Sequence, residues 1–111
     1  MNSSDAPDVL CVFTTTASEE EARAISQRLV SARLAGCVQV IGPIHSTYRW
    51  EGKMEQAQEW LCLAKTDAEH YPSVEEAIRE VHSYDVPEIV AVPAAHVDAR
   101  YRNWLTATLN E

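Results

Sequence analysis

The chain has 111 residues, of which 46% are hydrophobic and 23% charged, a composition typical of one soluble globular domain. Nine basic residues stand against 17 acidic ones, and the formal net charge of -8 argues against a nucleic-acid partner, whose phosphates it would repel. No apolar run approaches the length of a membrane span, so we expect no membrane partner.

Residues 1–8 read MNSSDAPD and lack the basic and apolar regions of a signal peptide. We therefore expect a flexible N-terminus over residues 1–8, a single domain over residues 9–111 and a cytoplasmic protein. The three cysteines, Cys11, Cys37 and Cys62, include no CxxC pair. We interpret them as small buried hydrophobic residues in a reducing compartment.

Residues 9–13 form a continuous apolar run, which predicts a buried first strand. Ser18 and Glu21 then have the spacing of a capping box, so a helix should begin there. Apolar side chains follow at helical spacing through Ala32, and Gly36 is the expected end of the helix.

Residues 37–66 predict a long β-hairpin around which the rest of the chain is organised. Apolar and polar side chains alternate along the first arm, whereas residues 60–64 are apolar on both faces and should lie inside a sheet. Gly52 suits a turn with positive φ, and the proline of Gly42–Pro43 predicts a bend or bulge. Each arm is about twice the usual strand length, so we expect the hairpin to pair with another copy of the chain.

The second half of the chain completes a familiar order of elements. A helical stripe runs from Val74 to Val81, Pro87 prevents its continuation, and residues 88–93 form a short β-rich run. Asp98 can cap a last helix. The order β-α-β-β-α-β plus a C-terminal helix predicts an α+β, ferredoxin-like sandwich with two helices on one face of an antiparallel sheet.

The common enzyme motifs are absent: the chain has no GxGxxG, P-loop, GxSxG or HExxH. The four histidines, His45, His70, His82 and His96, show no metal-ligand spacing. Spacing alone does not exclude a Cys–His catalytic pair. His82 follows the second helix, either as a dipole-favoured terminal residue or as a polar anchor in a cleft.

Glu59 and Lys65 flank the apolar run 60–64 on the same face of the predicted strand. They are either exposed strand ends or opposite charges that face an interface. We expect four aromatic residues to pack either in the core or at an interface. They are Trp50, Tyr84, Tyr101 and Trp104.

Several stretches between Val9 and Leu109 resemble the CutA family, which is named for tolerance to divalent cations. The matching stretches are Thr14–Thr15, Leu34–Cys37, Ser46–Lys53, Glu59, Lys65–Thr66, Val81–Ile89 and Tyr101–Trp104. The resemblance implies a PII-like homotrimer in which extended strands pair between subunits. It also implies a cytoplasmic protein linked to copper and other divalent metals, with no settled catalytic activity.

On this resemblance we expect an intersubunit cleft. Its predicted lining residues are Trp50, Glu59, Lys65, His82, Tyr84 and Glu88. Weak binding of Cu(II) or another divalent cation would involve His82 and Cys37. Some family members carry a cysteine and a second histidine at the positions of Thr14 and Val81, so this chain lacks those two metal ligands.

The leading hypothesis is a non-enzymatic homotrimer that contributes to divalent-metal tolerance or response. The alternative is a PII-like signalling adaptor that binds a protein partner and has no metal role. A small hydrolase on the same fold is a weaker third hypothesis, because Thr14–Ala17 offers neither an anion-cradling loop nor an arginine.

Overall fold

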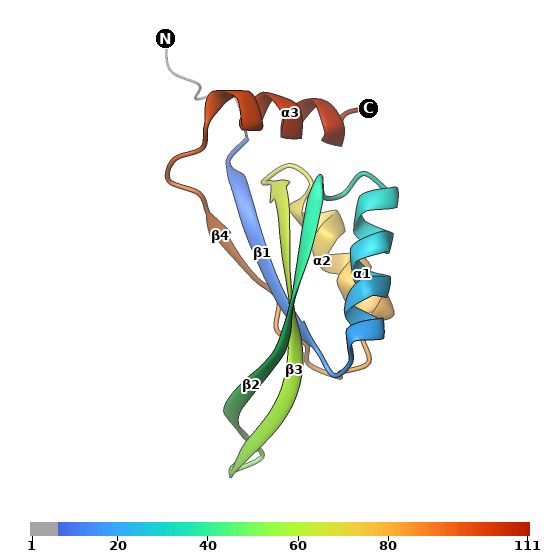
Figure 1. Cartoon of the computed structure of the whole chain (residues 1–111), viewed down its shortest axis with the longest axis vertical. Coiled ribbons are helices and arrows are strands. Elements are labelled where there is room, and N and C mark those ends of the chain that lie inside the picture. Colours follow the sequence, from blue (N-terminus) through green and yellow to red (C-terminus); the bar gives the residue numbers. More distant parts are fainter. Residues whose placement is uncertain (1–6) are drawn as a thin grey trace.

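The computed structural model describes residues 7–111, so most of the segment predicted to be flexible lies outside the described residues. The elements are β1 (Val9–Thr16), α1 (Glu19–Ser31), β2 (Cys37–Trp50), β3 (Lys53–Asp67), α2 (Tyr71–Val81), β4 (Val90–Pro93) and α3 (Ala99–Leu109). The strands form one sheet in the order β2-β3-β1-β4, and every neighbouring pair is antiparallel. The predicted α+β, ferredoxin-like fold with its C-terminal helix is confirmed (Figure 1).

The main core lies between the sheet and the helices α1 and α2, which both pack on one face (Figure 1). It is centred on Val12, Ile25, Leu29, Cys62 and Ile78, each no more than 1% exposed. Cys62 is thus a buried core residue, whereas Cys11 and Cys37 are only half-buried. Helix α3 lies across the end of the sheet and forms a second, smaller apolar cluster.

Helix α1 ends earlier than the sequence suggested. Its last residue is Ser31, and the chain turns at Arg33, which has a φ of 60°. Gly36 already leads into the sheet, because its N–H donates to the carbonyl of Lys65 at 3.0 Å. A Cβ atom on Gly36 would lie 2.5 Å from Cδ1 of Leu105, so the glycine allows α3 to approach closely.

The long hairpin is present as predicted, with 14 residues in β2 and 15 in β3. Its tip consists of Glu51 and Gly52, which have φ values of 52° and 81°. One extra residue between Ile41 and Ile44 shifts the register, which confirms the bulge predicted at Gly42–Pro43. The outer half of the hairpin extends beyond the helices and makes the molecule 51 Å long but only 25 and 22 Å across (Figure 1).

The sheet face opposite α1 and α2 carries an apolar row. Phe13 of β1 pairs with Val90 on one side and Leu63 on the other, so all three side chains share this face. Val90 is 49% exposed and Phe13 and Leu63 are half-buried. Apolar side chains of this size in a row on a sheet favour contact with another surface.

Candidate functional site

A cleft of about 480 Å³ lies where the outer hairpin meets the segment between α2 and β4. Three parts of the chain contribute to it: the end of β1, the facing arms of β2 and β3, and residues 84–88. Its lining residues are Thr15, Tyr48, Trp50, Glu59, Tyr84, Asp85, Val86, Pro87 and Glu88. The inner half of the hairpin belongs to the core sheet, and its outer half forms one wall of this cleft.

A hydrogen bond between Tyr84 and Glu59 fixes one wall of the cleft. The Tyr84 hydroxyl donates to Oε2 of Glu59 at 2.8 Å, and Glu59 is only 6% exposed. Burial, followed by the hydrogen bond and the negative charge of Glu59, raises the pKa of the Tyr84 hydroxyl above its ordinary range. The tyrosine therefore remains a neutral donor to a carboxylate at physiological pH.

His82 lies behind the cleft and anchors the segment that carries Tyr84. Its Nε2 lies 2.7 Å from the carbonyl oxygen of Thr15, and its Nδ1 accepts the backbone N–H of Tyr84 at 3.1 Å. A carbonyl can only accept, so Nε2 carries the proton and the ring is the neutral Nε2–H tautomer. His82 is also the C-cap of α2, but its side chain is 0% exposed and a neutral ring gains little from the helix dipole, which favours the anchor alternative.

The same segment is also tied to the start of α1. Glu21 accepts two hydrogen bonds from Ser83, one from its N–H at 2.7 Å and one from its hydroxyl at 3.1 Å. The carboxylate also lies 3.6 Å from Nδ1 of His82. Because these contacts join α1, β1 and the segment after α2, they hold Tyr84 in place over the end of the sheet.

Four of the six predicted cleft residues, Trp50, Glu59, Tyr84 and Glu88, line this cavity within a single chain. Lys65 lies six residues further along β3 than Glu59, about 20 Å in an extended strand. Its ammonium group donates to the side-chain carbonyl of Gln39 at 2.9 Å. Whether these residues share an intersubunit cleft stays a prediction.

Five further lining residues were not predicted from the sequence: Thr15, Tyr48, Asp85, Val86 and Pro87. A local signal existed for Tyr48, which is two residues from Trp50 and therefore on the same face of the strand. Asp85, Val86 and Pro87 lie between Tyr84 and Glu88, so the whole segment could have been taken together. No local pattern places Thr15 opposite them.

The metal roles predicted for His82 and Cys37 stay predictions. Both ring nitrogens of His82 already make hydrogen bonds, so a metal ion would have to displace one of them. Cys37 pairs with Lys65 in the sheet, and Cys11 pairs with the same lysine from the other side. The two cysteines are therefore two strand spacings apart, about 10 Å, which is too far for one ion to bind both thiolates.

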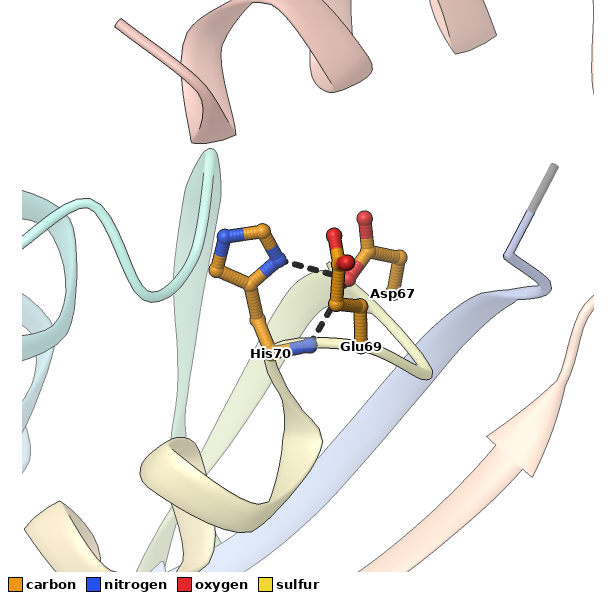
Figure 2. A group of neighbouring side chains, drawn as sticks. All are labelled: Asp67, Glu69 and His70. Atoms are coloured by element: carbon orange, nitrogen blue, oxygen red, sulfur yellow. Dashed lines mark hydrogen bonds and ion pairs between the residues drawn. The ribbon is translucent and has the colours of Figure 1, made fainter.

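Within residues 7–111, one group of side chains has the spacing of a metal site: Asp67, Glu69 and His70. Figure 2 shows them on the turn between β3 and α2. Their potential ligand atoms all lie within 4.8 Å of one another. Oδ1 of Asp67 accepts hydrogen bonds from the backbone N–H of His70 at 2.9 Å and from its Nδ1 at 2.7 Å. Two carboxylates and an imidazole suit a divalent transition metal, but the Asp67–His70 bond also stabilises the turn without one.

Known proteins similar to this chain identify its family. The family described as "CutA1 divalent ion tolerance protein" matches residues 10–108. The chain belongs to the CutA1 family. The resemblance inferred from its motifs is thereby confirmed.

The divalent-cation tolerance protein CutA of Thermus thermophilus is 44% identical over 94 residues, which are 85% of this chain and 91% of that protein. Human protein CutA is 36% identical over 87% of this chain, but the chain spans about half of its length, 54%. The crystal structure of CutA from Xylella fastidiosa matches with a TM-score of 0.89 at 36% identity, covering 92% of this chain and 98% of that one.

The relatives are named for tolerance of divalent cations, and these names specify no reaction. A CutA of Archaeoglobus fulgidus, with a TM-score of 0.88 at 35% identity over 91% of this chain and 98% of that one, is described as periplasmic. A cytoplasmic location for the present chain thus stays a prediction. No helix within residues 7–111 is long and apolar enough to cross a membrane.

Proposed function

We propose that this CutA1 protein is a non-enzymatic homotrimer that binds a small ligand in the Glu59–Tyr84 cleft as part of the response to divalent cations. The observation that carries the proposal is the cleft itself. Its walls come from three separate parts of the chain and are fixed by the buried His82 and by the Tyr84–Glu59 hydrogen bond. Such a cavity, with a few fixed polar groups among apolar walls, has the character of a ligand site.

The trimer is supported by three features of the single chain. The apolar row of Val90, Phe13 and Leu63 is open to contact, and the outer hairpin extends beyond the helices of its own chain (Figure 1). Strand β4 is a short edge of the sheet, and its Val92 is 46% exposed. Light scattering after size exclusion should give three chain masses at micromolar concentration, and a monomer would contradict the proposed assembly.

The cation role is supported by the family and by the chemistry of Asp67, Glu69 and His70. Copper(II) titration of the wild type should give weak, chelator-sensitive binding that His70→Ala reduces. His82→Ala and Cys37→Ser test the two ligands predicted from sequence. If no variant changes the copper affinity, none of these three side chains is a ligand, and the acidic surface binds the metal diffusely.

A PII-like adaptor that binds a protein partner is a second candidate, and the hairpin tip favours it. Met54 is 69% exposed there, and exposed methionines suit adaptable protein contacts. The charge-introducing variant Met54→Glu should abolish capture of such a partner from lysate while leaving cleft ligand affinity unchanged. Loss of the partner with Glu59→Gln instead would assign partner binding to the cleft.

A further inference from the structure

We propose that the cleft binds an organic cation, a small ammonium compound with apolar carbon around its charge. This inference rests on the small-ligand function proposed above and specifies the chemical class of the ligand. It follows from the charge of the lining, from the aromatic groups beside that charge and from the spacing of the carboxylates.

All formal charges in the cleft lining are negative. Glu59, Asp85 and Glu88 contribute carboxylates, and the nine lining residues include no lysine, arginine or histidine. An anionic ligand would meet repulsion without a compensating cation. A cationic ligand would meet attraction in a hollow partly shielded from water, where charge interactions are stronger than at an open surface.

Aromatic rings provide the second half of a cation site. Tyr48 and Trp50 lie two residues apart on β2 and share one face, and Tyr84 contributes a third ring from the segment between α2 and β4. Tyr48 and Trp50 are 44% and 46% exposed, so a ligand can reach them. Ammonium groups are attracted to the faces of such rings, and tryptophan is the most favourable of them.

The spacing of the carboxylates argues against a bare metal ion as the ligand. Within residues 7–111, only Asp67, Glu69 and His70 bring three potential ligand atoms within 4.8 Å, so Glu59, Asp85 and Glu88 do not. Metal ions require oxygens at 2.0–2.6 Å. Charges spread around a cavity of about 480 Å³ instead suit a cation with several carbon atoms.

Glu59 is the residue best placed to recognise the charge. The Tyr84 hydroxyl occupies Oε2, and it is the one hydrogen-bond donor to this carboxylate within residues 7–111. Oε1 can therefore accept a hydrogen bond from a ligand, and a primary ammonium group could donate to it. A quaternary ammonium would interact with the same carboxylate through charge alone, so the two kinds of cation test different contacts.

The decisive experiment is calorimetric titration of the intact protein with choline and with 1,4-diaminobutane. The matched probe is 3,3-dimethylbutan-1-ol, which has the shape of choline but no charge, and acetate serves as the anion. We expect the cations to bind at least about tenfold more tightly than the alcohol, with an affinity that decreases as salt is added. Acetate should not bind.

Glu59→Gln should weaken cation binding by about tenfold or more while keeping an oxygen that can accept from Tyr84. Trp50→Leu should weaken it as well, and the exposed Glu76→Gln on α2, outside the lining, is the control. If Trp50→Leu fails to assemble, Glu59→Gln still decides the matter, with thermal unfolding as a check on its fold.

Equal binding of choline and the neutral alcohol, or binding of acetate, would overturn the cation assignment but leave the cleft as a ligand site. Cation binding that is unchanged in Glu59→Gln would also overturn it. If none of the organic probes binds, the small-ligand function and the cation assignment both fail.

Discussion

Replacing Tyr84 with phenylalanine would test whether the Tyr84–Glu59 hydrogen bond stabilises the cleft wall. The substitution keeps the ring and removes the hydroxyl that donates to a carboxylate only 6% exposed. Hydrogen bonds to charged groups contribute about 1.5–3 kcal/mol, and water from the cleft can replace part of that. We therefore expect Tyr84→Phe to lower the free energy of unfolding by about 1–2 kcal/mol.

A double-mutant cycle separates this hydrogen bond from general effects of the substitution. In a Glu59→Gln background the acceptor is neutral, so Tyr84→Phe should cost only about 0.5–1 kcal/mol. Tyr101→Phe is the control, because the Tyr101 hydroxyl makes no hydrogen bond within residues 7–111. Urea unfolding at one fixed protein concentration gives the free energies. Equal costs of Tyr84→Phe in both backgrounds would refute the reasoning.

The pH dependence of the same variant has a definite sign. The pKa of Tyr84 in the folded protein is raised above its ordinary value of 10.0, by burial first and then by Glu59. Below pH 10 the stabilisation is fully present, because tyrosine is protonated in both states. Above pH 10 the unfolded chain loses this proton first, so wild-type stability should decrease relative to that of Tyr84→Phe. A constant difference between the two proteins from pH 8 to 11 would contradict this.

Three further predictions concern the fold. Gly52→Val should lower stability by about 1 kcal/mol or more through backbone strain alone, since no atom lies within 4 Å of its Cβ position; an unchanged melting temperature would contradict this. Gly36→Ala should lower the free energy of unfolding by about 1–3 kcal/mol, because the new methyl group would collide with Leu105. In urea unfolding, part of that cost should disappear when Gly36→Ala is combined with Leu105→Ala. Additive costs of the two substitutions would argue against the contact. Burial raises the pKa of the Cys62 thiol to about 11. In a variant with the other two cysteines changed to serine, this thiol should react with dithionitrobenzoate at pH 8 only after unfolding. Rapid reaction of the native protein would contradict the burial.

The hairpin could be predicted from sequence because every signal for it is local. Alternation along residues 38–50 identifies a half-buried strand, and the apolar residues 60–64 identify a central one, as the strand order confirms. Gly52 and Pro43 mark the turn and the bulge through their own backbone preferences. The end of α1 was less predictable, because Arg33 has a positive φ that its side chain does not favour.

The cleft could be predicted only in part, because its residues meet across long stretches of chain. Glu59 and Lys65 share one face of β3, but that shared face does not reveal that of the two only Glu59 lines the cleft. His82 was compatible with two environments, and its partner, the carbonyl of Thr15, is 67 residues away in sequence. A main-chain acceptor leaves no trace in residue identity, so the anchor role required the structure.

Ligand binding and assembly should be coupled in this protein through the outer hairpin. Tyr48 and Trp50 belong to an arm that extends past the helices, so within one chain it has few neighbours to hold it in place (Figure 1). Contact with another copy would fix the arm and reduce the entropy that a ligand must overcome to bind. Because such coupling is reciprocal, a cleft ligand should stabilise the assembly by the same free energy. A ligand that binds without changing the dissociation constant of the assembly would show that the arm is already rigid in the isolated chain.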